Sequence, residues 1–531
     1  MTSRRGSSER GSAIADNVDA ARIGAWLIVV LLIPRLVRML YPEVWIEDDF
    51  YLESAWMVSV GMRPYLDFVH PHMPMLEWLA GCYLKLFGTG HLSIEILNES
   101  AIFATSILTY ALGRRVAGRR AAIVASILYG YSSLVFRYHA YERECFVAPL
   151  LLLAAIVTLD ETLPVLRQAI FLALIFFAAC VIKLTAIIAL AVMLVFIAVA
   201  YGRILSAALS GVIFLTLLTG FSAFLYRLYG IEFVFQTFVF HFLKGRDTEP
   251  SVALYFYPRM ILDIIAPLFV IGCWRTFADR IFSRAMILVL AIVGAEYLFY
   301  GVLSPTAWGH NYLEAIPFIA IVAGIGGSTL VESVGELITS ENRDKSEWQR
   351  LAAGVALIAI FLFWLTPLIN ENWLHGSVYG FGFVPRAEVL QLADALRIAS
   401  KPDEDVVAPS FICFAAGRKE LIRYPETYGV YREAKVEFDR DGFFAARRKL
   451  GNADFFQLII ETRHFWTGQI RDAILAGKVS AVISDSPVQL LPLVLVPDDF
   501  LTQNGFRATL VTEHFALWTR GGQPNPLTPF P

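Results

Sequence analysis

Charged residues are scarce in this sequence. Only 17% of its 531 residues are Asp, Glu, Lys or Arg, whereas a soluble domain of ordinary composition carries about 25%. The net charge of -3 lacks the basic excess of a nucleic-acid-binding protein, so no nucleic-acid partner is expected. The five cysteines are scattered, without a CxxC or a Cys/His spacing, which argues against a disulfide framework and a structural zinc site.

Hydrophobic residues, in contrast, make up 57% of the chain, raise the mean hydropathy to +0.58 and gather in long runs. Runs of about 20 apolar residues are typical of transmembrane helices. We therefore predict a mainly α-helical, polytopic membrane protein with about eleven spans, at 24–41, 93–112, 121–136, 145–159, 167–182, 184–201, 205–226, 259–273, 285–303, 311–331 and 351–369. No cleavage signal follows the polar, Arg-rich tail 1–23, so the first span is expected to be retained as a helix.

The orientation depends on one stretch, 167–201. It is too long for one span, and we predict two helices with Lys183 at the turn between them. Sixteen basic residues then lie in the segments on the N-terminal side of the membrane and nine on the other side. The positive-inside rule places the N-terminus in the cytoplasm and, after an odd number of spans, the C-terminal domain outside. One long helix at 167–201 would invert every later segment.

Two acidic clusters lie at the predicted outer face, whose loops are 42–92, 137–144, 227–258 and 304–312. The first loop carries Glu47-Asp48-Asp49, and the short second loop carries Glu142-Arg143-Glu144. A carboxylate in such a place can act as a general base or hold a metal ion. A merely solvated acidic edge is the alternative.

Basic groups and aromatic residues share this face. Lys183 interrupts an apolar run, and we weigh a function there equally with snorkelling to the membrane surface. The loop 227–258 alternates Phe with other residues, which is consistent with a half-buried strand but favours a segment lying in the membrane interface. His241, Lys244 and Arg246 within it would suit an anionic lipid headgroup, with an ordinary interfacial anchor as the alternative.

The segment EDDFYLESAWMVSVGMRPYLDFVHPHMPMLEWLAGCYLKLFG (47–88) resembles the first outer loop of the GT-C superfamily of glycosyltransferases. The nearest branch is that of the protein mannosyltransferases and aminoarabinose transferases. The matching positions are Asp48/Asp49, Tyr51, Ala55, Gly61, Tyr65, Asp67, Pro71/Pro74 and Leu86-Phe87-Gly88. The second and third spans of the family are resembled by residues 110–133, YALGRRVAGRRAAIVASILYGYSS. A later segment of the family is resembled by residues 309–324, GHNYLEAIPFIAIVAG. The resemblance covers about residues 24–370.

The resemblance implies transfer of a sugar from a polyprenyl-phosphate donor, outside the cytoplasmic leaflet and usually with inversion. Asp48 would be the general base, with Asp49 as its close rival. Glu142 and Glu144 would match a second acidic site for the acceptor or a divalent metal. Because that site reads Glu-Arg-Glu and contains no Asp, metal dependence stays open. The implied candidates for the phosphate side are His72, Lys183, Lys244, Arg246 and His310.

Residues 375–531 have the composition of a small soluble α/β domain. We predict a helix at 386–400, short strands in DVVAPS (405–410), FFQLIIE (455–461) and VSAVISD (479–485), and a closing hairpin at 506–520. This domain contains no recognisable catalytic constellation. Selection of the acceptor and a structural cap are both open roles for it.

Two other functions are possible for the membrane domain, residues 24–374, besides that of a glycosyltransferase. One is a transporter or flippase of a lipid-linked sugar, but the sequence shows no convincing internal repeat and its polar residues collect at one face. The other is a non-catalytic subunit of an envelope assembly complex. We favour the enzyme, in a bacterial inner membrane, with membrane lipid around it and an envelope lipid, glycan or protein as acceptor.

Overall fold

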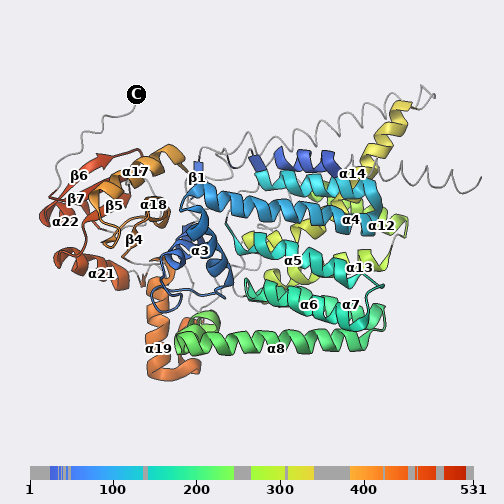
Figure 1. Ribbon diagram of the computed structural model, residues 1–531, viewed down its shortest axis with the longest axis horizontal. Helices are drawn as coiled ribbons and strands as arrows, with labels where there is room; N and C mark the ends of the chain where they lie inside the picture. Colours follow the sequence, from blue (N-terminus) through green and yellow to red (C-terminus); the bar gives the residue numbers. More distant parts are fainter. Residues whose placement is uncertain are drawn as a thin grey trace, which may run out of the picture.

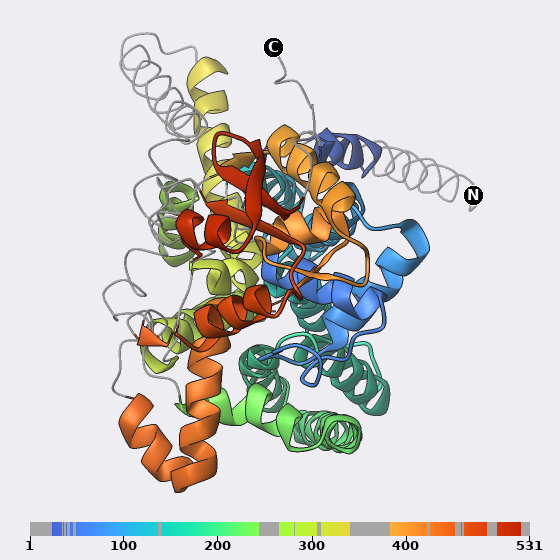
Figure 2. The same ribbon diagram turned by 90° about the vertical axis from the view of Figure 1, so that its left-hand side faces the viewer.

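The computed structural model describes residues 24–33, 35–36, 39, 43–45, 49–135, 141–243, 265–280, 282–304, 309–339, 383–421, 425–451, 458, 461–462, 464–485 and 496–521. Long helices lie side by side in a bundle, and the C-terminal domain covers one end of it (Figure 1). Figure 2 looks onto that end, where the domain lies in front of the helix ends. The first loop lies between the two parts.

The bundle helices follow the predicted spans closely. They are α4 (His91–Val135), α5 (Arg143–Thr158), α6 (Val165–Cys180), α7 (Ile187–Ala200), α8 (Ile204–Tyr229), α12 (Ala266–Ala278), α13 (Arg284–Leu298) and α14 (Ile316–Thr339). Four stretches, Val165–Ile182, Ile204–Tyr229, Arg284–Leu303 and Ile316–Ser333, are long and apolar enough to cross a membrane. The chain is therefore an integral membrane protein. The expected span 351–369 lies outside the described residues, so the count of eleven stays a prediction.

Two helical hairpins appear where the sequence predicts them. Within α4 the backbone turns at Gly118, whose φ of 81° lies in the left-handed region that favours glycine. The Ser126 hydroxyl donates to the carbonyl of Ser106 at 2.6 Å, which joins the two arms of this hairpin. The stretch 167–201 likewise divides into α6 and α7, and a short 3-10 turn, η3 (Leu184–Ala186), follows Lys183.

Basic side chains tie together the turns at one end of the bundle. Arg115 donates to the carbonyl of Ile156 at 2.9 Å, and Arg203 to that of Leu163 at 3.2 Å. Arg284 lies 3.4 Å from Glu161 on the same turn. These three arginines were predicted to share one side of the membrane, and the structure gathers them. Which compartment that side faces stays a prediction.

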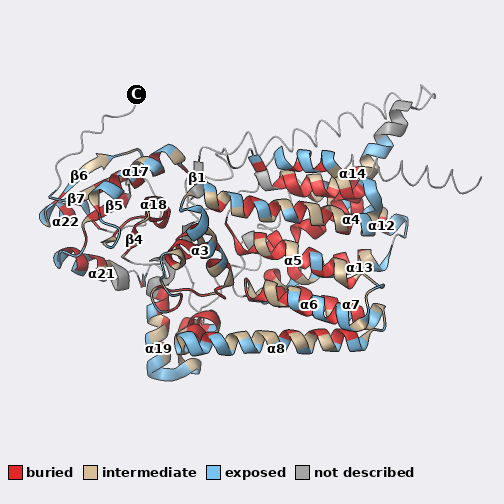
Figure 3. Cartoon of the chain, in the orientation of Figure 1, coloured by how far each residue is buried: buried red, intermediate tan, exposed pale blue. Residues whose placement is uncertain are grey.

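Glycines allow two bundle helices to pack unusually close. A Cβ atom on Gly272 of α12 would lie 2.0 Å from the carbonyl oxygen of Val322 on α14, and one on Gly326 would lie 2.0 Å from that of Leu268. Close backbone approach of this kind is how membrane helices gain contact without a hydrophobic driving force. The outer surface of α8, in contrast, is apolar and exposed, as lipid contact requires (Figure 3).

The aromatic segment after α8 is helical, so the half-buried strand considered for it is wrong. It forms α9 (Ile231–Val234), a π-helical turn η4 (Phe235–Val239) and α10 (Phe240–Leu243). Phe233, Phe235 and Phe240 are buried inside the protein. The first loop and the C-terminal domain supply protein contacts for them. The position of this segment relative to the membrane interface stays a prediction.

The described part of the first loop contains β1 (Glu43–Trp45), α2 (Asp49–Ser59) and α3 (Met75–Phe87). The helices α2 and α3 pack on each other through Ala55 and Gly81. A Cβ atom on Gly81 would lie 3.0 Å from the carbonyl oxygen of Ala55, so this contact favours glycine. The middle of α2 is thus packed closely against α3.

The C-terminal domain combines helices with short strands, as predicted. Its elements are β2 (Phe383–Pro385), α17 (Arg386–Ala399), β3 (Asp405–Val406), α18 (Ser410–Ala416), β4 (Lys419–Glu420), α19 (Pro425–Leu450), α21 (His464–Leu475), β5 (Ala481–Asp485), α22 (Asp498–Gln503), β6 (Phe506–Val511) and β7 (Phe515–Arg520). The strands β5, β7 and β6 form an antiparallel sheet that includes the predicted hairpin.

One predicted strand of this domain, at 455–461, is wrong where the structure describes it. Leu458 and Glu461 are helical, and the amide of Thr462 donates to the carbonyl of Leu458 at 3.0 Å. Leu458 belongs to the apolar cluster that joins α10 and α19 to Val69 of the first loop and Phe235 of η4. Its side chain therefore packs in that cluster from a helical turn.

Candidate functional site

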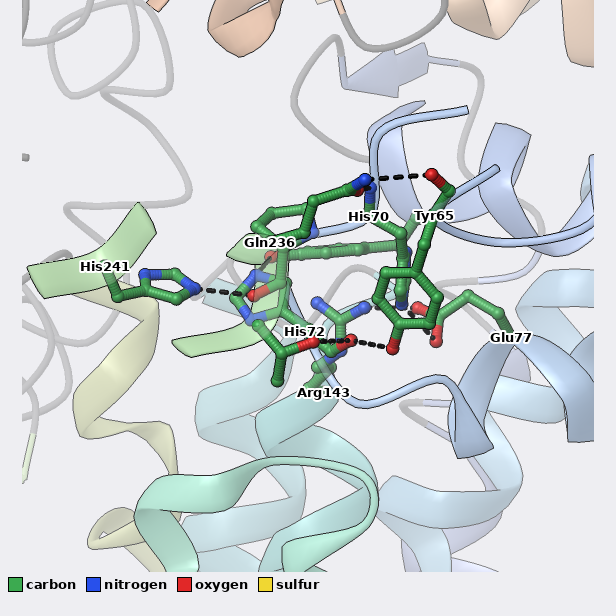
Figure 4. A network of polar contacts seen from close by, with 10 residues as sticks. Tyr65, His70, His72, Glu77, Arg143, Gln236 and His241 are labelled. Carbon is green, nitrogen blue, oxygen red and sulfur yellow. Dashed lines mark hydrogen bonds and ion pairs between the residues drawn. The ribbon is translucent and has the colours of Figure 1, made fainter. Parts of the chain in front are cut away.

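A buried ion pair joins the starts of α5 and α3. Arg143, at the beginning of α5, pairs with Glu77 of α3, and its side chain is 2% exposed. The guanidinium carbon lies 4.1 Å from the ring centre of Tyr51 on α2, in cation–π geometry. His70 places its Nε2 atom 3.3 Å from the other carboxylate oxygen of Glu77. Figure 4 shows Arg143, Glu77 and His70 close to one another.

Glu77 is fully buried and still ionised. Burial alone would raise the pKa of its carboxyl group, but Arg143 and His70 outweigh that effect and hold the pKa at about 2. A buried carboxylate of this kind fixes the position of its cationic partner. The pair therefore anchors the start of α5 to the first loop.

His72 lies at the centre of the second group of contacts. Its Nε2 atom is 3.3 Å from the hydroxyl of Tyr51, and its carbonyl accepts a hydrogen bond from Tyr65 at 2.6 Å. The ring of His241, on α10, lies 5.5 Å from the ring of His72. The Nε2 atom of His241 also donates a hydrogen bond to the carbonyl of Pro71 at 2.5 Å. Two imidazoles, from segments far apart in sequence, thus lie together beside the Arg143 pair (Figure 4).

Gln236, in the π-helical turn, connects this loop to α9 and α10. Its Oε1 atom accepts from the amide of His70 at 2.7 Å, and its Nε2 atom donates to the carbonyl of Tyr65 at 2.9 Å. The side chain is 2% exposed. Because both ends of the amide are engaged, the first-loop segment 65–70 has a fixed position against the helix.

Lys183 forms a second buried cluster. Its Nζ atom lies 2.6 Å from Glu144, 2.7 Å from Glu314 and 3.0 Å from the hydroxyl of Tyr300. The amide of Asn311 donates to the same Glu144 oxygen at 2.9 Å. Since Glu144 directly follows Arg143, the first turn of α5 links the two clusters.

Solved structures provide the comparison that decides the fold. The chain is similar to ArnT from Cupriavidus metallidurans bound to undecaprenyl phosphate, with a TM-score of 0.63 and 14% identity over 95% of this chain and 100% of that one. The apo state of ArnT gives a TM-score of 0.62. The chain has the fold of ArnT. An Archaeoglobus fulgidus oligosaccharyltransferase matches at a TM-score of 0.44 and 14% identity, over 87% of this chain and 69% of that one. No protein-family model and no curated protein sequence matches.

The fold brings some of the predicted site residues together. Glu144 and Lys183 are in direct contact, and His72 is joined to Arg143 through Tyr51. Asp49 is the first residue of α2, His310 lies in the 3-10 helix η7 (Gly309–Glu314), and Glu142 is buried immediately before α5. Asp48, Lys244 and Arg246 lie outside the described residues.

Several residues of the site were not predicted. They are His70, Glu77, Gln236, His241 as a partner of His72, Tyr300, Asn311 and Glu314. One signal for Glu77 was present, because an arginine that becomes buried almost always has a carboxylate partner. Nothing in the sequence identified which carboxylate, since Arg143 and Glu77 are 66 residues apart.

A divalent metal was one expectation for the second acidic site. In the described part of the chain, no three His, Cys, Asp or Glu side chains gather closely enough to hold a metal ion. The Oε1 atom of Glu144 already accepts from both Lys183 and Asn311. A cation beside that oxygen would meet the ammonium group of Lys183. The donor set around Glu144 therefore does not fit a divalent ion, and no metal-dependent step follows from it.

Proposed function

We propose that this GT-C protein transfers a sugar from a polyprenyl-phosphate donor to an acceptor of the cell envelope, at the outer face of the membrane. The observation that carries the proposal is the meeting of α2, α3, α5 and the α6–α7 turn at one end of the bundle. Charged groups are buried there beside the first loop. Ionisable groups so close to membrane helices are costly and mark functional sites by default.

The reaction we infer needs one base and one leaving phosphate. A hydroxyl or amine of the acceptor attacks the anomeric carbon, the bond from that carbon to the phosphate oxygen breaks, and the configuration inverts. The acceptor proton passes to Asp48 or Asp49. Asp49 begins α2, where the positive end of the helix dipole favours the ionised carboxylate, the form that a general base must have.

Cationic and imidazole groups would stabilise the polyprenyl phosphate as it leaves. His72 is our first candidate, because its ring lies against that of His241 and within 3.3 Å of the Tyr51 hydroxyl. Lys183, Lys244, Arg246 and His310 remain proposed for the same role. Lys183 already pairs with Glu144 and Glu314, so it would have to exchange a carboxylate partner to reach a phosphate. Glu142 and Glu144 are proposed to contact the acceptor.

The test is transfer by the purified protein. Wild type, Asp48→Ala, Asp49→Ala and the control Asp279→Ala would be incubated with a panel of polyprenyl-phosphate sugars and an envelope extract as acceptor. Release of free polyprenyl phosphate is measured. Asp279 pairs with Arg275 at the opposite end of the bundle, so its loss removes a carboxylate without touching the site. We expect release by wild type and by the control, and loss of at least about 100-fold in one first-loop variant.

Other outcomes would favour the competing functions. Donor-dependent thermal stabilisation that survives both first-loop substitutions, without release from any donor, would favour a transporter of a lipid-linked sugar. Absence of both release and stabilisation would favour a non-catalytic subunit. Activity retained in both Asp variants would overturn the assignment of the base while leaving the transferase intact.

A further inference from the structure

The C-terminal domain holds the first loop on both sides of the predicted base. Strand β1 pairs antiparallel with β2 of that domain, with Val44 opposite Val384. Helix α18 packs against α2, and Phe414 of α18 is buried in the same apolar cluster as Leu52 of α2. Strand β1, before the predicted base in sequence, and helix α2, which begins at Asp49, thus each have a packing partner in the C-terminal domain. Figure 1 shows α18 beside the first loop.

A third contact reaches the histidine segment of the same loop. The hydroxyl of Tyr431, on α19, donates to Glu232 of α9 at 2.5 Å. Gln236 donates from Nε2 to that hydroxyl oxygen at 3.3 Å and to the carbonyl of Tyr65 at 2.9 Å. Its Oε1 atom accepts from the amide of His70 at 2.7 Å. A continuous chain of hydrogen bonds therefore runs from α19 to the residue two positions before His72.

The hydrogen-bond partners of Gln236 fix the orientation of its side-chain amide. Its acceptor end faces the amide of His70, and its donor end faces Tyr65 and Tyr431. A flipped amide would place the NH2 group against a donor and the oxygen against a carbonyl, and both are unfavourable in a buried site. Tyr431 is in turn oriented because its proton goes to Glu232, which leaves its oxygen free to accept. The ring of Tyr431 also packs against Phe235, 5.6 Å away between centres.

We propose that Tyr431 and Gln236 are positioning residues, through which α19 of the C-terminal domain sets the His70–His72 segment for the donor phosphate. The inference rests on the proposed function, because it assigns the phosphate to that segment. It gives the C-terminal domain a role in donor binding, in addition to any role in acceptor selection or as a cap.

Tyr431→Phe tests the proposal with the smallest change, since it removes one hydroxyl and keeps the ring. Gln236→Leu removes the whole amide at similar volume. The matched control is Ser484→Ala, which removes the hydrogen bond from Trp518 at 3.0 Å inside the sheet of the same domain. Three quantities are measured in detergent: the Kd for undecaprenyl phosphate, the donor KM of transfer and its kcat.

We expect Tyr431→Phe to raise both the Kd and the donor KM about tenfold, the typical scale for one lost hydrogen bond, with kcat within about twofold of wild type. Gln236→Leu is expected to have the larger effect, and Ser484→Ala none. A purely structural role would lower the amount of active protein and the melting temperature, with Kd and KM unchanged. That result would overturn the proposal.

Failure of the proposed function is a separate outcome. If wild type releases no polyprenyl phosphate from any donor, transfer is disproved. The Kd for undecaprenyl phosphate then still tests the positioning role of Tyr431 and Gln236. Undecaprenyl phosphate that binds wild type and binds Tyr431→Phe about tenfold more weakly would retain the positioning role. Equal binding by both, or no binding by wild type, would refute it.

Discussion

The Nζ atom of Lys183 lies 2.6 Å from a carboxylate oxygen of Glu144, which is 39 residues away in sequence. Glu314 approaches the same ammonium group at 2.7 Å. All three side chains are nearly shielded from solvent, with 11%, 3% and 0% of their area exposed. One lysine thus holds together two carboxylates that would otherwise repel each other.

Loss of this lysine should destabilise the membrane domain. Lys183→Met leaves two buried carboxylates without their shared cation, and we expect a loss of about 3–5 kcal/mol in the free energy of unfolding. Adding Glu144→Gln removes one of the two charges, so the double variant should recover part of that loss. Denaturant unfolding in detergent measures both. The single variant Glu144→Gln completes the comparison. If the loss in the double variant equals the sum of the losses in Lys183→Met and Glu144→Gln, the two residues are not coupled.

Glu77 predicts how stability depends on pH. Its folded-state pKa of about 2 lies below the usual 4.5, so the unfolded chain binds a proton at higher pH than the folded chain does. The resulting stabilisation is fully present above about pH 4.5 and is lost as the pH falls toward 2. Its size is about 3 kcal/mol by the usual conversion of a pKa shift.

The matched variant for this pH effect is Glu77→Gln, which leaves Arg143 buried without its carboxylate. It should be less stable than wild type at neutral pH, and the difference should shrink as the pH falls from 4.5 toward 2. Melting temperatures of both proteins across that range measure it. A difference that stays constant with pH would mean that Glu77 is not the group responsible.

Two glycines on bundle helices should respond oppositely to alanine. At Gly326 the added Cβ would lie 2.0 Å from a backbone oxygen of α12, so α12 and α14 must separate, and we expect a loss of about 1–3 kcal/mol. At Gly294 of α13 nothing lies within 4 Å of the added Cβ, and alanine should stabilise the helix by about 0.5–1 kcal/mol. Thermal unfolding in detergent compares the two. A destabilised Gly294→Ala would contradict this packing.

Much of the membrane domain was predictable because its signals are local. Apolar runs set the helices, and the lysine in the middle of 167–201 indicated the break between α6 and α7. The aromatic segment 231–243 shows the limit of that reasoning. Its alternating Phe residues match the period of a strand, but burial on several sides lets a helix, with one π-helical turn, accommodate them. A periodicity argument assumes one buried face, and this segment has more than one.

By itself, the sequence determined that the chain crosses a membrane, that basic residues gather at the turns of one end, and that helices and short strands follow in the C-terminal part. These properties depend on hydropathy and charge within short windows. Only the tertiary structure decided that Arg143 takes Glu77 as its partner, that Lys183 is shared by two carboxylates, and that Gln236 joins the first loop to α19. A buried charge must find a partner, but the close approach of helices and loops determines which residue that partner is.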